Sequence, residues 1–388
     1  MKKTAYIIDP YSHGSYHEVI NQGYLMMVAE LYNNVVYIAD KTSCDNLRLL
    51  LDKCNIKHDN ILFVEKQFRK FNLKNKSLSY LINILIVSFW NYYYYIKTPS
   101  YADVFYNNNL FFAVIFISIF SKKNKQIYDM CHNEMELINS KSVYSMATYI
   151  LSKYFRFIFC KLKLDKIFHF ILLSPKMVSY FNSFIPTKNH ARMFSIDHSY
   201  IRTDININDK IETINCDNRV KIGIPGAITA LRGLSTLKKI LDKINNDDIC
   251  IYALSSCSEN IDNKSFIQIN KNNQLMPAEQ YSAYVKSMDM MLLFYDVDSY
   301  KLTASGAILE AVWNEKPVIA LKNMYFNYLF EKFNSLGVLK DDIDGIIEVL
   351  NSIHNKEYFN KSCIMNLKNA RMKLLPQNTC MQLRTIIE

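Results

Sequence analysis

The sequence predicts an α/β protein with two domains, each built around a parallel β-sheet. Three observations lead to this prediction. The 388 residues exceed what one ordinary hydrophobic core uses and suffice for two domains of roughly 150–200 residues. Short apolar runs alternate with helical stretches along the whole chain, which is typical of parallel sheets. Finally, half of the residues are apolar but only eight are Gly and eight are Pro, which argues against a β-sandwich or a disordered chain.

The first half of the chain is expected to alternate six strands with six helices. Each predicted strand is a short apolar run. The strands are expected at residues 5–9, 35–39, 61–65, 103–107, 126–130 and 170–174, and the helices near 16–32, 43–54, 77–97, 110–121, 140–162 and 176–184.

The second half repeats the pattern after a polar stretch around residues 196–217. Strands are expected at 220–226, 249–255, 266–270, 289–295 and 316–321, and helices near 233–244, 277–288, 304–314, 325–335, 342–353 and 357–373. We therefore expect two Rossmann-like domains. The predicted segments are a first domain at 1–198, a linker at 199–217, a second domain at 218–374 and a C-terminal segment, 375–388, that packs back on the first. Ligands of open parallel sheets bind beyond the carboxyl ends of the strands, so a cleft between the domains is the expected site.

The net charge of +10 lies entirely in the first half of the chain. Residues 1–200 hold 24 Lys and Arg against 14 Asp and Glu, whereas the remainder holds 22 of each. This asymmetry indicates an anionic partner for the first domain, either an anionic membrane surface or an anionic acceptor. No nucleic-acid-binding motif accompanies the charge, so nucleic acid is not an expected partner.

The nine cysteines show no CxxC spacing and no zinc-ligand pattern, so no metal site is expected. Reduced thiols of a cytoplasmic protein are the preferred interpretation. The N-terminus reaches Asp9 after five apolar or small residues and is interpreted as a first strand rather than a signal peptide.

Three stretches raise the question of membrane contact. Residues 80–96 and 110–120 are strongly apolar, but neither reaches the roughly 20 clean apolar residues of a spanning helix, so buried or interfacial helices are favoured. Residues 149–176 interleave aromatic rings with Lys153, Arg156 and Lys161. This pattern fits an anionic bilayer surface and fits a solvated amphipathic helix equally well.

The most informative stretch is SGAILEAVWNEKPVIAL, which begins at Ser305 and follows a buried apolar run. Small residues open a predicted helix there, and its exposed N–H groups and dipole suit a diphosphate. Glu310 lies about one and a half turns into that helix, where a carboxylate can accept hydrogen bonds from ribose hydroxyls.

This block resembles the donor-binding motif of glycosyltransferase family 4 and related GT-B enzymes of bacterial surface-polysaccharide synthesis. The resemblance implies that Glu310 holds the nucleotide ribose. It also implies that the loop of Thr303, Ser305, Gly306 and Ala307 contacts the diphosphate and the sugar. The family often carries a second, earlier glutamate, and this chain has Leu302 at that position.

A second stretch, GIPGAITALRG, resembles the first loop of the family's C-terminal domain. There the resemblance implies that Gly226 follows the strand and that Arg232 neutralises the leaving diphosphate, a task that suits the fork of a guanidinium. Lys301 is the expected second basic residue. Leu275 is placed by the resemblance in the pocket for the nucleobase.

Three histidines are candidate catalytic residues in the first domain. His13 and His17 flank Gly14 in the loop after the first strand, where Gly14 lets the backbone approach a diphosphate. Both histidines titrate near neutral pH and suit a general base or a hydrogen-bond donor. His132 follows a later strand and resembles the histidine that many family 4 enzymes carry near the transferred sugar.

These observations favour a hexosyl-type glycosyltransferase, cytoplasmic or peripheral on the inner face of the cytoplasmic membrane. It would use a UDP- or GDP-sugar donor and a glycan or polyprenyl-linked acceptor, without a permanently bound cofactor. Two alternatives stay open, a GT-B nucleotide-sugar epimerase and a non-catalytic glycan- or membrane-binding scaffold.

Overall fold

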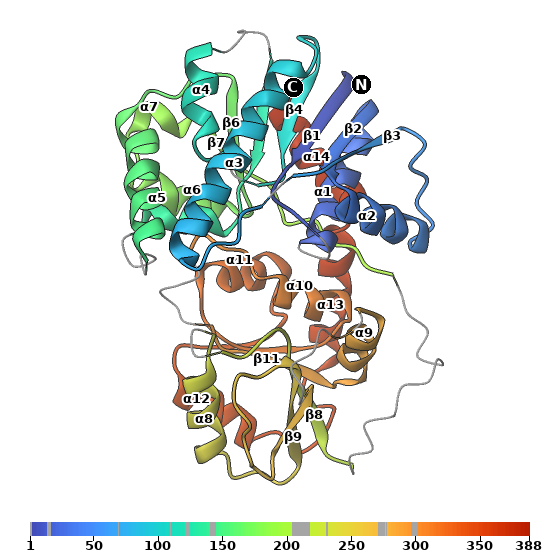
Figure 1. Cartoon of the computed structure of the whole chain (residues 1–388). Coiled ribbons are helices and arrows are strands. Elements are labelled where there is room, and N and C mark those ends of the chain that lie inside the picture. Colours follow the sequence, from blue (N-terminus) through green and yellow to red (C-terminus); the bar gives the residue numbers. More distant parts are fainter. Residues whose placement is uncertain are drawn as a thin grey trace. The chain divides into compact units, whose positions relative to one another are not determined.

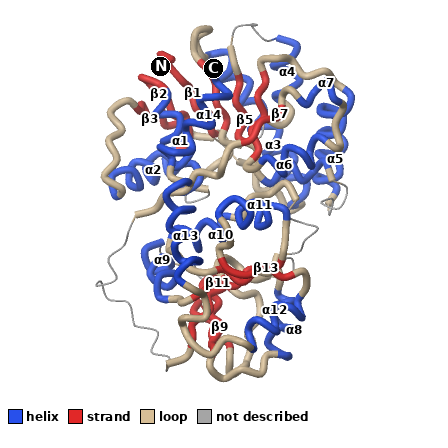
Figure 2. Tube along the Cα trace, turned by 180° about the vertical axis from the view of Figure 1, so that it is seen from behind, coloured by secondary structure: helices blue, strands red, loops and turns tan. Residues whose placement is uncertain are grey.

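The computed structural model divides into two compact units. It describes residues 2–13, 17–68, 70–108, 110–120, 125–139, 145–203, 218–229, 232–270, 276, 278–295 and 301–388. The first unit comprises Met1–Thr203, Leu302–Ala304 and Leu374–Glu388, and the second comprises Asp204–Lys301 and Ser305–Lys373. Both alternate strands and helices along the chain (Figure 2).

The first unit contains a parallel sheet of seven strands in the order β3-β2-β1-β4-β5-β6-β7. The strands are β1 (Lys2–Asp9), β2 (Tyr32–Asp40), β3 (Ile61–Lys66), β4 (Asp103–Tyr106), β5 (Ile127–Met130), β6 (Phe168–Leu172) and β7 (Met193–Ser195). Central β1 pairs with β2 on one side and β4 on the other, with Ile7 opposite Tyr37 and Phe105. The strand order reverses between β1 and β4, so the loops after these two strands flank the position where such sheets bind ligands.

Helices cover both faces of this sheet (Figure 1). Right-handed crossovers place the helices between β1 and β3 on one face and those between β3 and β7 on the other. On the first face, α1 (Glu18–Leu31) packs against α2 (Lys41–Lys53) and α14 (Pro376–Ile387). On the second, α3 (Lys76–Lys97) packs against α4 (Ala113–Phe120) and α5 (Met146–Arg156). Among the described residues of this unit, the remaining helical segments are the 3₁₀-helix Asn133–Ile138, a π-helical turn Phe157–Lys161, α6 (Pro175–Asn182) and α7 (Thr187–His190).

The second unit contains a parallel sheet of six strands in the order β10-β9-β8-β11-β12-β13. The strands are β8 (Val220–Ile224), β9 (Ile249–Ser256), β10 (Phe266–Asn270), β11 (Met290–Leu293), β12 (Val318–Leu321) and β13 (Gly337–Lys340). The helices are α8 (Leu234–Lys243), α9 (Ala278–Ser287), α10 (Gly306–Trp313), α11 (Met324–Phe333), α12 (Ile343–Asn351) and α13 (Lys361–Lys373). Here the order reverses between β8 and β11, so the loops after them flank the expected ligand position.

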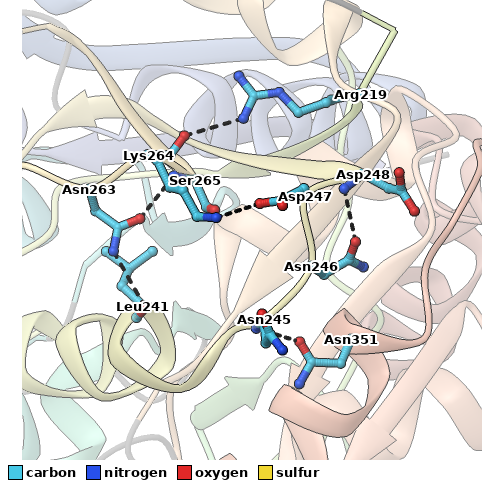
Figure 3. Close-up of polar contacts among 10 residues, drawn as sticks. All are labelled: Arg219, Leu241, Asn245, Asn246, Asp247, Asp248, Asn263, Lys264, Ser265 and Asn351. Atoms are coloured by element: carbon cyan, nitrogen blue, oxygen red, sulfur yellow. Dashed lines mark hydrogen bonds and ion pairs between the residues drawn. The ribbon is translucent and has the colours of Figure 1, made fainter.

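Structural polar contacts hold the amino ends of the second sheet's strands (Figure 3). The side chains of Asn246 and Asn263 accept hydrogen bonds from the backbone just before β9 and β10, at 2.9 Å each. Arg219, directly before β8, donates to the Lys264 carbonyl at 3.2 Å. These contacts fix turns between strands and helices at the amino edge of the sheet. The expected ligand position is at the opposite, carboxyl edge.

The prediction of two parallel α/β sheets is confirmed, and individual elements differ from those expected. The short edge strands β7 and β13 were not predicted. In place of the single helix expected at 140–162, α5 begins at Met146, where Ser145 and Thr148 form a capping box. The π-helical turn then follows α5 directly. Residues 140–144 lie outside the described residues. Among the described residues, no helix has the length and apolar character needed to cross a membrane.

Candidate functional site

A buried carboxylate organises the carboxyl edge of the first sheet. Asp9 is the last residue of β1 and is fully buried. Its carboxylate accepts hydrogen bonds from the Ser12 backbone and the Asn21 amide at 3.0 Å each, from the Tyr37 hydroxyl at 3.1 Å and from the Asn108 amide at 3.3 Å. The network thus fixes the loops after β1 and β4 together, at the reversal of the strand order.

Two of the predicted histidines meet at this edge, and a third histidine joins them. The rings of His17 and His132 lie 5.5 Å apart between centroids. His17 precedes α1 in a left-handed conformation, with φ of 58°, and His132 follows β5. His198, just beyond β7, is close enough to affect the titration of His132 and to be affected by His17. We call these three side chains the histidine cluster.

Burial keeps the histidine cluster neutral. It lowers the pKa of His132 well below its usual value, and the neighbouring His17 and His198 lower it further. Burial also lowers the pKa of His198 to about 4 and lowers the pKa of His17, an effect that the charge of Asp9 partly offsets. The Nδ1 of His198 lies 2.9 Å from the Ser199 carbonyl, so Nδ1 carries the proton and Nε2 presents a lone pair.

Carboxyl groups lie directly beside the cluster. The His132 backbone N–H donates to Glu134 Oε1 at 2.8 Å. Burial, reinforced by the charge of Glu134, raises the pKa of Asp129 well above its usual range. Within the described residues, no group of three or more His, Cys, Asp and Glu side chains has the arrangement of a metal site.

The other predicted residues of the first loop lie elsewhere or outside the described residues. His13 is exposed, and its Nδ1 lies 2.5 Å from the Lys70 ammonium and 3.4 Å from the Tyr11 carbonyl. Gly14 falls outside the described residues.

Glu136, on the 3₁₀-helix after His132, binds the segment Leu302–Ala304 that belongs to the first unit. Its carboxylate accepts hydrogen bonds from the Leu302 backbone at 2.5 Å and from the Thr303 hydroxyl at 3.2 Å. The predicted loop Thr303 to Ala307 is therefore divided, with Thr303 in the first unit and Ser305, Gly306 and Ala307 in the second.

The loop after β8 presents Arg232 on the second unit. Gly226 and Gly233 both have positive φ, 82° and 78°, and a Cβ at Gly233 would lie 2.6 Å from the Phe294 ring. The loop shape therefore requires glycine at Gly233. Arg232 is exposed and lines a small pocket with Pro225 and residues 293–295 at the end of β11. The pocket, of about 10 Å³, has room for one water molecule.

Helix α10 also borders the end of β11 and begins without a side-chain cap. Ser305 is its N-cap and is buried, but its hydroxyl makes no cap hydrogen bond. A Cβ at Gly306 would meet no atom within 4 Å, so open space lies beside the first turn. The uncapped N–H groups and the helix dipole favour an anion there.

Glu310 lies on the same helix, 3% exposed, with Oε1 3.2 Å from the Asn314 amide. Ala307, in the first turn of α10, is half-buried. Lys301, in the chain segment that connects β11 to α10, is also half-buried. Leu275 lies outside the described residues.

His198 is the residue that the sequence did not reveal. It follows a three-residue strand, β7, which has no long apolar run to signal it. The presence of a strand before Ile196-Asp197-His198 is the signal that would have placed His198 at the carboxyl edge.

Comparison with solved structures places the two units within a known fold. The chain matches WaaG, described as a glycosyltransferase of lipopolysaccharide biosynthesis, with a TM-score of 0.57 and 11% identity over 97% of this chain and 98% of that one. It also matches TarM of S. aureus, solved with fondaparinux, α-GlcNAc-glycerol and UDP, with a TM-score of 0.60 and 10% identity over 99% of both chains. The chain has the GT-B fold.

The fold alone does not decide the reaction. The N-terminal domain of the Candida albicans trehalose-6-phosphate phosphatase matches equally well, with a TM-score of 0.60 and 10% identity over 100% of this chain and 97% of that one. No family model and no curated protein sequence matches the chain. These comparisons therefore establish the fold, and any evidence for the activity lies in the residues described above.

Proposed function

We propose that the protein is a glycosyltransferase that moves a hexosyl group from a UDP- or GDP-sugar to a lipid-linked or growing polysaccharide acceptor. The observation that carries the proposal is the edge of the second sheet around the end of β11. There the guanidinium of Arg232 lies beside β11, and α10, which packs on β11, presents an uncapped N-terminus and the buried Glu310.

Each of these groups suits one part of a nucleotide-sugar. Arg232 is a permanent cation that would neutralise the charge gained by the leaving diphosphate. The first turn of α10, with Ser305, Gly306 and Ala307, would bind diphosphate oxygens through N–H groups. Glu310 would accept hydrogen bonds from the ribose hydroxyls. Lys301 and Thr303 are the proposed further contacts to the diphosphate and sugar, with Gly226 shaping the loop and Gly14 and Leu275 completing the donor contacts.

The histidine cluster would act on the hydroxyl groups. Because burial lowers the pKa of His132 and His17, both imidazoles are neutral at physiological pH and offer a lone pair. Such a group can accept a hydrogen bond from the transferred sugar or take the proton of the attacking acceptor hydroxyl. His13, on the exposed side of the same loop, is the third proposed contributor.

The acceptor is proposed to be anionic and presented at the inner face of the cytoplasmic membrane. The excess positive charge of residues 1–200 would attract a polyprenyl diphosphate or an anionic membrane surface. Among the structural neighbours, WaaG is described as acting in lipopolysaccharide biosynthesis.

A nucleotide-sugar thermal-shift screen tests this function. UDP-, GDP-, CMP- and dTDP-linked sugars are compared, and one is expected to raise the melting temperature. Arg232→Ala and Glu310→Ala should abolish the shift, whereas Lys264→Ala, a surface change on the same unit, should retain it. With a donor that binds, His132→Ala should keep binding but lower the transfer rate about 100-fold or more.

Binding in this screen, together with analysis of the products formed from a donor that binds, separates the alternatives. Free nucleotide released only when acceptor is present supports transfer, and nucleotide-sugar conversion without acceptor would indicate an epimerase. Absence of binding by every donor would leave a scaffold. A shift that survives both Arg232→Ala and Glu310→Ala would refute the proposed donor site.

A further inference from the structure

A groove on the first unit has no part in the proposed transfer site. It has a volume of about 490 Å³ and lies where α5 passes into the π-helical turn. Its walls carry Lys153, Arg156, Phe157, Cys160, Lys161 and Phe184. This volume is within the range of small-molecule sites in proteins.

The groove is positively charged, and the segment that supplies most of its wall carries no acidic residue. Residues 145–164 contain four Lys and Arg and no Asp or Glu. Arg156 donates from Nε and Nη2 to the Ile138 carbonyl at 3.1 and 3.0 Å, which fixes the guanidinium in the wall. Among the described residues, none of Lys153, Arg156 and Lys161 forms an ion pair with a carboxylate. The charge of the groove therefore favours an anionic occupant.

Large exposed apolar side chains lie in the wall of the groove and along the helix that leads into it. Met146, Tyr149, Ile150 and Phe157 are 70%, 49%, 38% and 46% exposed. Their spacing along α5 and the following turn puts them with Lys153 on one helix face. Phe184 on the far wall is 38% exposed. An outward helix face is ordinarily polar, whereas this one combines apolar and basic residues, as interfacial helices do.

The π-helical turn gives the groove its shape. The Leu162 N–H donates to the Phe157 carbonyl at 3.2 Å, a bond across five residues that widens the helix. The Cys160 thiol donates to the Phe184 carbonyl at 3.3 Å, which ties this wide turn to the residues after α6.

A second exposed apolar face lies on the neighbouring helix α3. Helix α3 packs against α5, and the Ser77 hydroxyl accepts a hydrogen bond from the Ala147 backbone at 3.0 Å. Along α3, Leu85, Phe89, Tyr93 and Ile96 recur at helical spacing and are 38–58% exposed. Two helices that pack together on the same face of the sheet, α5 and α3, thus both expose large apolar side chains.

We propose that this groove is a binding site for an anionic phospholipid of a bilayer. Lys153, Arg156 and Lys161 bind the phosphate of the headgroup, while Phe157 and Phe184 contact the start of its acyl chains. The apolar residues of α5 and α3 enter the interfacial layer around the bound lipid. This site specifies the membrane partner within the proposed function, on which it rests, and it uses no residue of the donor site.

Vesicle sedimentation tests the charge requirement. The full-length protein is mixed with phosphatidylcholine vesicles with and without phosphatidylglycerol, and binding is expected only with phosphatidylglycerol. Lys153→Gln/Lys161→Gln should weaken binding about thirtyfold, since each basic residue near an anionic surface contributes a roughly fivefold gain. The matched control is Lys57→Gln/Lys66→Gln, exposed lysines at the opposite edge of the same sheet, which should change binding less than about twofold.

Alkylation of Cys160 tests occupancy of the groove itself. A maleimide is applied, and modification of Cys160 is followed by mass spectrometry of its peptide. Phosphatidylglycerol vesicles should slow the reaction at least about fivefold, whereas phosphatidylcholine vesicles and soluble glycerol phosphate should not.

Three results would overturn the proposal. One is equal loss of vesicle binding in the two lysine pairs, which would mean attraction to net charge alone. Another is an unchanged rate of Cys160 alkylation on phosphatidylglycerol vesicles. The third is protection of Cys160 by glycerol phosphate, which would mean a site for a soluble phosphate. Transfer assayed with a soluble donor and acceptor reports on the proposed function separately, so either proposal can fail alone.

Discussion

At the scale of single residues, the histidine cluster couples the site to the stability of the fold. His198 is 3% exposed, and its pKa of about 4 lies below that of a solvated imidazole. The unfolded chain therefore binds a proton below about pH 6.5 that the folded chain accepts only near pH 4. As the pH falls through this window, the unfolded state gains protons first and the folded state loses stability.

His198→Asn should flatten this pH dependence. The amide can still donate to the Ser199 carbonyl but cannot be protonated. Between pH 7 and pH 4, the free energy of unfolding should fall by about 3 kcal/mol less than in the unmodified protein. Urea unfolding at the two pH values measures this. Equal losses in both proteins would mean that His198 titrates normally in the fold.

The carboxyl edge also shows what the sequence could and could not predict at this scale. Asp9 ends the first strand that the sequence predicts, and His17 and His132 are candidates because each lies close beyond a predicted strand. Their meeting depends on the strand order, which brings β1, β4 and β5 together although about 120 residues separate His17 from His132. No local pattern encodes that adjacency. His198 needed knowledge of β7, whose three residues are too few for an alternation to be visible.

At the scale of elements, two buried serines at helix starts make different contacts. Ser174 is the N-cap of α6 and accepts a hydrogen bond from the Met177 N–H at 3.1 Å. Ser305 is the N-cap of α10 and makes no such bond. A capping serine stabilises its helix, whereas a serine beside uncapped N–H groups leaves them for a ligand.

Alanine substitutions should separate the two serines. Ser174→Ala is expected to lower the free energy of unfolding by about 1 kcal/mol, as loss of a cap does. Ser305→Ala should change it by less than about 0.5 kcal/mol and should weaken the binding of the nucleotide-sugar. Chemical unfolding and calorimetric titration measure the two effects. The reverse pattern would show that Ser305 is a structural cap.

Sequence patterns predicted elements well where the apolar run was long. Strands such as β9 and β10 and helices such as α3 lie within two residues of their expected bounds. The failures share a physical cause. The edge strand β13 is only half-buried along its four residues, so it needs no continuous apolar run. The π-helical turn after α5 changes the helix period without any glycine or proline to announce it.

At the scale of the whole molecule, the first unit is assembled from both ends of the chain. Helix α14 packs on α1 and buries Thr379, Cys380 and Leu383. The Gln382 side-chain N–H donates to the Asp197 carboxylate at 2.5 Å, and the Gln382 side-chain oxygen accepts from the Asp197 backbone N–H at 2.7 Å. The Tyr200 N–H donates to the Leu374 carbonyl at 2.9 Å. A segment distant in sequence thus packs on the helix layer at one face of the first sheet.

Truncation after Leu374 should destabilise the first unit selectively. Amide hydrogen exchange, read by mass spectrometry, should become faster in α1 and in residues 196–203, because their partners are gone. Exchange in the strands of the second unit, which α14 does not belong to, should stay unchanged. Unaltered protection of α1 would mean that α14 contributes no stability to that face.

The discontinuity of the first unit also sets the order in which a nascent chain can finish folding. Domains generally fold as their residues leave the ribosome, and the second unit is complete by Lys373. The first unit, although most of it is made earlier, must wait for residues 374–388. At about 5–20 residues per second, that wait lasts roughly 10–40 s after Thr203 has been added. Throughout this interval the part of α1 that contacts α14 is uncovered, so the first unit is the part of the newborn protein most in need of a chaperone.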